Sequence, residues 1–224
     1  SLFRHSPETP WNYRLLDQYQ QRVRDRVLSG GAGELIFSEV SPVVTLGRRM
    51  RPSLGDGQVP VYPTGRGGCE TYHGPGQWVV FAVDSLERLT GDRRGVRRAV
   101  EGLLGAGWRT ARAFGVDAEI REGAEWGIWS GGAKLGSVGI DVRGGILMHG
   151  MALNIFKVGE AFQGVRPCGL DTQPGYLFEG PFDEEVFLEG RARLEKELLE
   201  SFPNLLKFEA AKSIASALPA SVGA

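Results

Sequence analysis

The sequence has few cysteines, no long apolar run and almost no net charge. Cys69 and Cys168 are the only cysteines among 224 residues, which is too few for a disulfide framework, and no CxxC pair indicates a zinc site. The longest clean apolar run, Trp78–Val83, is far shorter than the ~20 residues of a membrane span. A formal net charge of -1 gives no overall field that favours nucleic acid or an anionic membrane. We therefore expect no metal, no nucleic-acid partner and no membrane partner.

The N-terminal stretch also lacks a targeting signal. Residues 1–14 contain no apolar core of the kind that a secretory signal requires. Together with the scarcity of cysteine, this predicts a reducing, cytoplasmic location. Apolar residues make up 42% and charged residues 24% of the chain, as in an ordinary globular protein. The length predicts a single domain over residues 1–208, and the Ala- and Ser-rich composition of the final stretch predicts a flexible tail over 209–224.

Hydrophobic periodicity predicts both helices and strands. Helices are expected at 11–28, 94–114 and 182–202. Strands are expected at 34–40, 43–46, 58–63 and 77–83, with several short strand-like pieces between 118 and 155. Helices at the ends and in the middle, with runs of strands between them, predict an α+β sandwich with a mixed sheet.

Glycine is abundant and unevenly distributed. The chain contains 33 glycines, about twice the usual share of roughly 7%. They gather at 65–76, at 131–150 and around Cys168. Glycine at this density is typical of tight turns or of backbone pressed against a ligand. These three glycine-rich regions, which contain four distinct motif segments, therefore hold the candidate site.

The first segment reads TGRGGCETYHGPGQ over residues 64–77. Arg66 supplies a permanent positive charge, and His73 can donate or accept a hydrogen bond near neutral pH. Either residue alone fits a surface hairpin as well as a binding site. The complete string, with its two glycine-rich turns, favours a loop that approaches a ligand from several sides.

The second segment, residues 131–140, places Lys134 among small and apolar residues. Lysines mostly lie at the surface, so this surrounding is unusual, and burial of Lys134 would ease proton transfer. A strand lysine that points outward fits the segment equally well.

A third segment follows, in which His149 precedes Gly150. A lone histidine here is compatible either with a structural role or with a ligand nearby.

The fourth segment places Cys168 between Pro167 and Gly169. Proline fixes φ on one side and glycine gives freedom on the other, which favours display of the thiol on a tight turn. A buried cysteine that acts as a small hydrophobic residue is the alternative.

Taken together, these segments resemble the lipoyl(octanoyl) transferase family. The resemblance extends from about residue 37 to residue 170, with the motifs in the family's order and spacing. The shared motifs are TLGRR at 45–49, RGG-x-x-TYHGPGQ at 66–77, GAK-x-x-S-x-G at 132–139, HG-x-ALN at 149–154 and PCG at 167–169. The long RGG motif is highly specific, whereas PCG alone is weak.

The resemblance implies the fold of biotin and lipoate protein ligases and a reaction without a cofactor. An octanoyl group would pass from octanoyl-acyl carrier protein to a lysine of a lipoyl-accepting domain, in 2-oxoacid dehydrogenase E2 subunits and the glycine cleavage H protein. Cys168 would carry the thioester, and Lys134 would be its activating partner. The implied acyl site comprises Arg66, Gly67, Gly68, Cys69, Glu70, Thr71, Tyr72, His73, Ser137, Val138, Gly139, His149, Gly150, Met151 and Ala152.

Cys69 departs from the family pattern, because many members have Gln, Glu or Asp at this position. An inert pocket residue, a second acyl acceptor and a thiol that pairs with Cys168 are all compatible with the sequence. Three other functions also stay open: an ATP-dependent lipoate or biotin ligase, a hydrolase that pairs the cysteine with a histidine, and a non-catalytic relative that binds acyl-carrier domains. Whether His73 or His149 assists the reaction is equally open.

Overall fold

The computed structural model describes residues 12–49, 59–123, 126–159 and 173–204. Cys168 and the tail predicted at 209–224 lie outside these residues. Within the described residues, no helix combines the length and the apolar character needed to cross a membrane.

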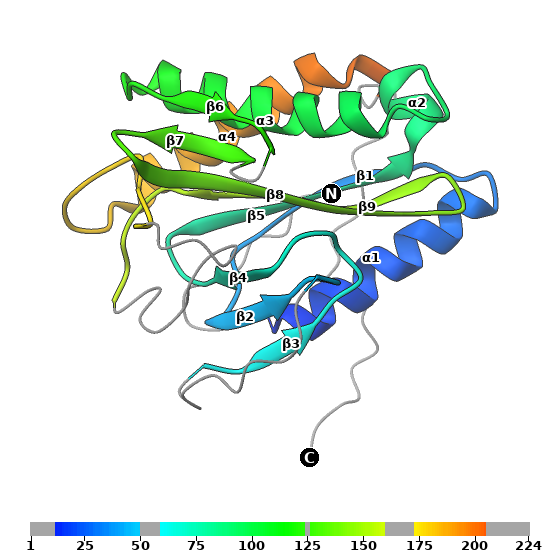
Figure 1. The fold of residues 1–224 in the computed structure, drawn as a ribbon, viewed down its shortest axis with the longest axis horizontal. Helices are drawn as coiled ribbons and strands as arrows, with labels where there is room; N and C mark the ends of the chain where they lie inside the picture. The colour runs from blue at the N-terminus through cyan, green and yellow to red at the C-terminus, as the bar shows by residue number, and fades with distance from the viewer. Residues whose placement is uncertain (1–11, 50–58, 124–125, 160–172, 205–224) are drawn as a thin grey trace.

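A six-stranded sheet forms the middle layer of the molecule (Figure 1). Its strand order is β1-β5-β9-β8-β7-β6, and every neighbouring pair is antiparallel. The strands are β1 (Glu34–Ser38), β5 (Gln77–Ser85), β6 (Glu119–Arg121), β7 (Gly127–Ser130), β8 (Ala133–Arg143) and β9 (Ile146–Asn154). Strand β9 is buried along its whole length and β5 along nearly all of it, because layers pack on both faces of the sheet.

Three helices cover one face of this sheet: α2 (Leu86–Thr90), α3 (Val96–Ala113) and α4 (Glu184–Ser201). The side chains of Leu103 and Leu194 are fully buried in the core between these helices and the sheet. Trp78 ties β5 to α4: its ring stacks on that of Phe187 at 4.4 Å, and its indole N–H donates to the Phe187 carbonyl at 2.9 Å. Asp183 caps α4 by accepting a hydrogen bond from the backbone N–H of Val186.

Helix α1 (Tyr13–Leu28) and a small sheet cover the opposite face (Figure 1). The small sheet has the order β3-β2-β4, with β2 (Val43–Leu46) parallel to β3 (Val61–Pro63) and antiparallel to β4 (Glu70–His73). Apolar side chains of α1, including Leu16 and Val23, pack with the β1 and β5 residues Ile36 and Phe81. The large sheet therefore lies between a helical layer and a layer made of α1 and the small sheet.

The predicted α+β sandwich is confirmed, and helices occur at all three predicted places. Among the described strands, parallel pairing occurs only between β2 and β3. The small sheet is therefore the mixed one, and the six-stranded sheet is antiparallel. Strand β4 was not predicted, because its residues were assigned to the glycine-rich loop.

The expectation of short pieces between residues 118 and 155 is wrong for β8 and β9, which form a long hairpin. Gly139 and Gly150 lie within these strands, where they were taken for interruptions. A Cβ atom at Gly150 would be 2.2 Å from the Val80 carbonyl oxygen, so glycine here permits close packing of β9 against β5.

Candidate functional site

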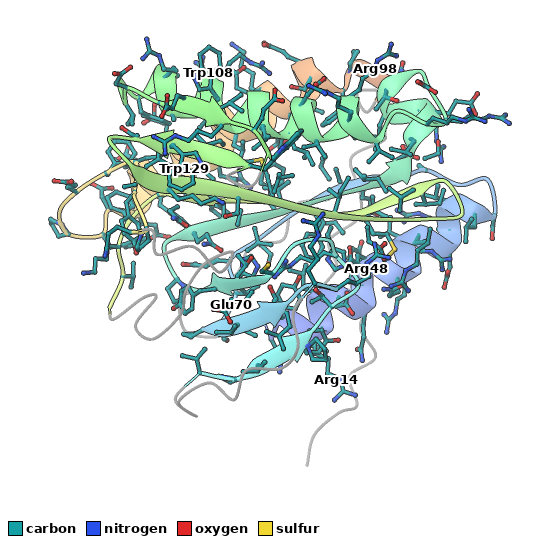
Figure 2. The ribbon with its side chains drawn as sticks, in the orientation of Figure 1. Arg14, Arg48, Glu70, Arg98, Trp108 and Trp129 are labelled. Carbon is teal, nitrogen blue, oxygen red and sulfur yellow. The ribbon has the colours of Figure 1, made fainter. Side chains whose placement is uncertain are left out.

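A pocket lies between the large sheet and the layer that contains the small sheet. Strands β4, β5, β8 and β9 contribute to its wall, together with the start of α1 and the loop before β4. Figure 2 shows Arg48 and Glu70 on this side of the large sheet and Trp108 on the helical side. The lining residues are Tyr13, Arg66, Gly68, Cys69, Thr71, His73, Val79, Phe81, Ser137, Val138, Gly139, His149, Gly150, Met151 and Ala152.

This pocket brings together every residue of the predicted acyl site except Gly67, Glu70 and Tyr72. Alternation along β4 explains two of the exceptions, because side chains of a strand point to opposite faces in turn. Thr71 and His73 face the pocket, whereas Tyr72 packs on the other side in a cluster with β2 residues. Substrate binding by the lining residues stays a prediction.

Three lining residues were missed by the sequence analysis: Tyr13, Val79 and Phe81. Val79 and Phe81 share one face of β5, so the two-residue period of a strand could have indicated that they lie together. Tyr13 lies more than fifty residues before the glycine-rich loop, and no local pattern links the two. Its ring nevertheless stacks on that of His73, with centroids 5.6 Å apart.

Arg66 places a fixed positive charge in the pocket wall. Only 6% of the residue is exposed. Its Nη2 donates to the carbonyl oxygen of Thr45 at 2.7 Å and to the Thr45 hydroxyl at 2.8 Å, while Nη1 donates to the Gly67 carbonyl at 3.0 Å. The guanidinium group does not deprotonate in proteins, so the charge stays in place at every working pH. Gly139 on β8 leaves room for this side chain, since a Cβ atom there would be 3.0 Å from Arg66 Cδ.

Ion pairs and a backbone hydrogen bond connect the loop that carries Arg66 to β8. The buried carboxylate of Asp141 accepts from Arg48 at 2.7 Å and from Arg143 at 2.6 Å. Beside these two ion pairs, the backbone N–H of Gly67 donates to the Ile140 carbonyl at 2.9 Å. Arg48 belongs to the TLGRR motif after β2, so these bonds join the small sheet to the large one at the pocket.

Both pocket histidines are held neutral. Burial lowers the pKa of His73 to about 4, and the charge of Arg66 acts in the same direction, while the hydrogen bond that His73 makes to Gln77 Oε1 acts in the opposite direction. Burial lowers the pKa of His149 to about 3, with further lowering by the positive charges of Arg66 and Arg143. At neutral pH each imidazole is therefore uncharged and can both donate and accept a hydrogen bond.

His149 has a backbone conformation that is rare for a residue with a side chain, with φ of 60°. Gln20 of α1 holds it there, since the backbone N–H of His149 donates to Gln20 Oε1 at 2.8 Å. The amide nitrogen of Gln20 lies 3.1 Å from Nδ1 and 3.5 Å from Nε2 of the ring. Such similar distances place the amide over the face of the imidazole rather than in its plane. Residues held in sparsely populated conformations are concentrated at functional sites.

Lys134 is buried, with 4% of the residue exposed, so the inward alternative for this lysine is confirmed. Its Nζ lies 5.2 Å from the centroid of the Trp129 ring. The side chain runs along β7, where a Cβ atom at Gly127 would be 2.5 Å from Lys134 Cε. Lys134 does not line the pocket, although Ser137, three residues further along β8, does.

The backbone of Lys134 pairs with residues that follow Cys168 in the sequence. Its N–H donates to the Gln173 carbonyl at 3.0 Å, and its own carbonyl accepts from the Gly175 N–H at 2.9 Å. Cys168, the predicted nucleophile, lies outside the described residues. The structure thus places the stretch that begins five residues after it against the predicted partner.

Cys69 is a half-buried free thiol in the pocket wall. In the described part of the chain, no group of three or more His, Cys, Asp and Glu side chains is arranged to hold a metal ion. The chemical groups that the pocket offers include a fixed cation, two neutral imidazoles, the Cys69 thiol and apolar β-strand side chains.

Comparison with known proteins finds octanoyltransferases among the relatives of this chain. Over 140 residues the chain is 44% identical to the octanoyltransferase of Methylococcus capsulatus, covering 62% of this chain and 66% of the relative. Over 160 residues it is 39% identical to the octanoyltransferase of Xanthomonas euvesicatoria, covering 70% of this chain and 67% of the relative. The chain therefore spans about two thirds of the length of these relatives.

Solved structures share the fold. A lipoate-protein ligase A bound with ATP superimposes with a TM-score of 0.66 at 16% identity, covering 86% of this chain and 82% of that one. A bi-partite lipoate protein ligase from Thermoplasma acidophilum gives a TM-score of 0.54 at 15% identity, covering 92% and 83%. These neighbours confirm the predicted likeness to the catalytic domain of lipoate protein ligases.

The model of the lipoyl protein ligase A/B catalytic domain matches residues 12–173. That span contains all five sequence motifs and every described residue of the pocket wall. The predicted resemblance to the octanoyltransferases is confirmed by relatives at about 40% identity. The chain belongs to the lipoyl protein ligase A/B catalytic domain family.

Proposed function

We propose that this protein is an acyltransferase that moves an octanoyl group to a lysine of a lipoyl-accepting domain, through a thioester on Cys168. The observation that carries the proposal is the pocket, in which the family's motif residues converge on a wall with an apolar part and a polar part. Val79, Phe81 and Met151 offer an apolar surface to a medium-length acyl chain. Arg66 and the two histidines offer polar groups to its carbonyl end.

The pairing of Lys134 with Gln173 and Gly175 supports the proposed roles of Cys168 and Lys134. A free thiol has a pKa near 8.5, so only a small fraction is thiolate at neutral pH. An ammonium group about 4 Å from a thiolate contributes about 4 kcal/mol at an effective dielectric constant of about 20, before desolvation is subtracted. Lys134 would therefore favour the thiolate of Cys168, protonate the departing thiolate of the donor, and accept the proton that the substrate amine loses.

The proposed donor is octanoyl-acyl carrier protein, because exchange of one thioester for another is nearly isoenergetic and needs no nucleotide. The proposed acceptors are lipoyl-accepting domains, those of 2-oxoacid dehydrogenase E2 subunits and the glycine cleavage H protein. The octanoyltransferase relatives support octanoyl as the group transferred. A structural neighbour that was analysed with its E2 lipoyl domain supports a lipoyl domain as acceptor.

An ATP-dependent ligase is the second candidate, because lipoate-protein ligase A binds ATP on the same fold. The two reactions differ in whether the acyl group arrives activated. We expect full turnover with octanoyl-acyl carrier protein and a lipoyl domain in nucleotide-free buffer, measured as octanoylated domain by mass spectrometry. Transfer that occurs only with free octanoate and ATP would assign the protein to the ligase reaction instead.

A further inference from the structure

His73 is connected to the backbone of Lys134 by a relay of two side-chain amides. His73 Nδ1 lies 2.7 Å from Gln77 Oε1, and Gln77 Nε2 donates to Asn154 Oδ1 at 2.7 Å. Asn154 Nδ2 in turn donates to the carbonyls of Gly175 at 2.9 Å and Lys134 at 3.3 Å. The relay thus extends from the pocket wall to the strand that carries the proposed partner of Cys168.

The two backbone carbonyls that Asn154 contacts determine which way each amide in this relay is oriented. Backbone carbonyls only accept, so the Asn154 atom that faces them is the amide nitrogen, and Oδ1 must face Gln77. Gln77 therefore points its NH₂ group at Asn154, where it also lies 3.4 Å from the Tyr72 carbonyl. Its oxygen is left to face His73. Since an amide oxygen only accepts, His73 Nδ1 must carry the proton.

A neutral imidazole with its proton on Nδ1 has a bare lone pair on Nε2. In the described part of the chain, the polar contact of the His73 ring is the one to Gln77, and Nε2 has no hydrogen-bond partner. His73 is 94% buried and belongs to the wall of the pocket, so this acceptor is available to a molecule that enters. Tyr13 stacks on the ring and limits its rotation.

We infer that His73 is a fixed hydrogen-bond acceptor that receives an N–H group of the substrate, and that Gln77 and Asn154 are positioning residues that set its tautomer. This inference rests on the proposed function for the identity of the donor group. The substrates of that reaction bring N–H groups from two sources: the attacking amine of the acceptor lysine and the amide of the donor's thioester arm. An octanoyl chain has no such group.

The Nε2 lone pair of His73 could accept either a hydrogen bond or the proton itself, and the low basicity of the imidazole decides between these two roles. With a pKa of about 4, the imidazole accepts a hydrogen bond at neutral pH but does not retain a transferred proton. His73 therefore orients the N–H donor, while the proton itself must go elsewhere, under the proposed function to Lys134.

The tautomer can be observed directly by long-range ¹H–¹⁵N correlation NMR of the 224-residue protein. The sequence contains three histidines, His5, His73 and His149, so His5→Gln and His149→Gln variants assign the signals. We expect His73 to show the neutral Nδ1–H form as a single tautomer at neutral pH. A neutral Nε2–H form, or a protonated ring, would overturn the inference without any assay of activity.

A matched pair of variants tests the relay. Gln77→Leu removes the fixed acceptor beside Nδ1, so the His73 signals should move to values typical of mixed tautomers. Gln20→Leu changes another buried glutamine, which contacts His149, and should leave the His73 signals in the Nδ1–H form. Retention of a pure Nδ1–H form in Gln77→Leu would contradict the positioning role. If Gln77→Leu does not fold, the wild-type spectrum still decides the tautomer.

The two half-reactions distinguish the sources of the N–H group. His73→Phe keeps a flat ring but removes the acceptor, and His73→Gln restores an amide oxygen that can accept. Loss of one hydrogen bond predicts that His73→Phe slows one half-reaction roughly 10- to 100-fold, with partial recovery in His73→Gln. Slower formation of the octanoyl-enzyme would identify the donor's amide. Slower transfer from a preloaded octanoyl-enzyme to the lipoyl domain would identify the lysine amine.

Unchanged rates in both half-reactions would overturn the proposed contact with substrate. Failure of the wild-type protein to form any octanoyl-enzyme is a different outcome, because it contradicts the proposed function and leaves the NMR result in force.

Discussion

The backbone N–H of Lys134 donates a hydrogen bond to the Gln173 carbonyl across 3.0 Å. Lys134 lies on β8 of the large sheet, and Gln173 stands five residues after Cys168 in the sequence. This bond joins a central strand of the sheet to the described segment that begins five residues after the predicted nucleophile. It makes the pairing of Cys168 with Lys134 a specific and testable proposal.

Replacement of Lys134 by arginine should separate charge from proton transfer. Arginine keeps a positive charge but does not deprotonate at working pH. We expect Lys134→Arg to retain part of the thiol's reactivity, while transfer to the lipoyl domain falls roughly 10²- to 10⁴-fold. Rapid-quench measurement of octanoyl-enzyme and octanoylated domain gives the two rates separately.

Lys157→Arg is the matched control, because Lys157 is an exposed lysine beyond the end of β9. It should transfer at the wild-type rate. A wild-type rate in Lys134→Arg would show that Lys134 is not the proton acceptor.

Acid should destabilise the fold through the pocket histidines. Burial lowers the pKa of His73 to about 4 and that of His149 to about 3, from an ordinary value of 6.5. Below pH 6.5 the unfolded chain binds protons that the folded protein does not, so the free energy of unfolding decreases as pH falls. The decrease tends to about 1.4 kcal/mol per pH unit for each histidine, until the pH reaches the folded value.

Urea unfolding between pH 6 and pH 5 measures this slope. In His149→Gln the slope should be smaller than in the wild type by about 1 kcal/mol per pH unit, whatever the variant's overall stability. Equal slopes would mean that His149 titrates in the folded protein as it does in the unfolded chain, which would contradict the lowered pKa.

Asp141→Asn should weaken the attachment of the Arg66 loop to β8. The buried carboxylate accepts from both Arg48 and Arg143, and the neutral amide would leave these contacts poorly satisfied. We expect a loss of about 1–3 kcal/mol in the free energy of unfolding, measured by urea denaturation. Glu101→Gln is the control, because its ion pair with Arg97 is exposed to solvent and should contribute little to stability. Equal effects of the two variants would contradict a structural role for Asp141.

Much of the pocket could be predicted from the sequence, because its residues occur in short motifs that reach the wall together. His149, Gly150, Met151 and Ala152 are consecutive on β9, and Ser137–Gly139 on β8 lie beside them in the register of the hairpin. Motif recognition could therefore find the residues without knowledge of the strands themselves.

What the sequence could not indicate depends on contacts between distant segments. Gln20 and Tyr13 lie on α1, whose apolar spacing predicts a helix but not the histidine each one meets. The relay from His73 through Gln77 and Asn154 joins three strands by side-chain amides, which leave no periodic pattern. Glycines inside β8 and β9 were taken for interruptions between short strands, because close approach to another backbone is visible only in three dimensions.

The most direct test of the account is the intact mass of the protein after incubation with octanoyl-acyl carrier protein, followed by peptide mapping. The wild-type mass should increase by one octanoyl group that hydroxylamine removes, and mapping should place the group on Cys168. Cys69→Ser, which changes the thiol of the pocket wall, should retain the adduct, whereas Cys168→Ser should lose it. An adduct that persists in Cys168→Ser, or that maps to Cys69 in the wild type, would contradict the account.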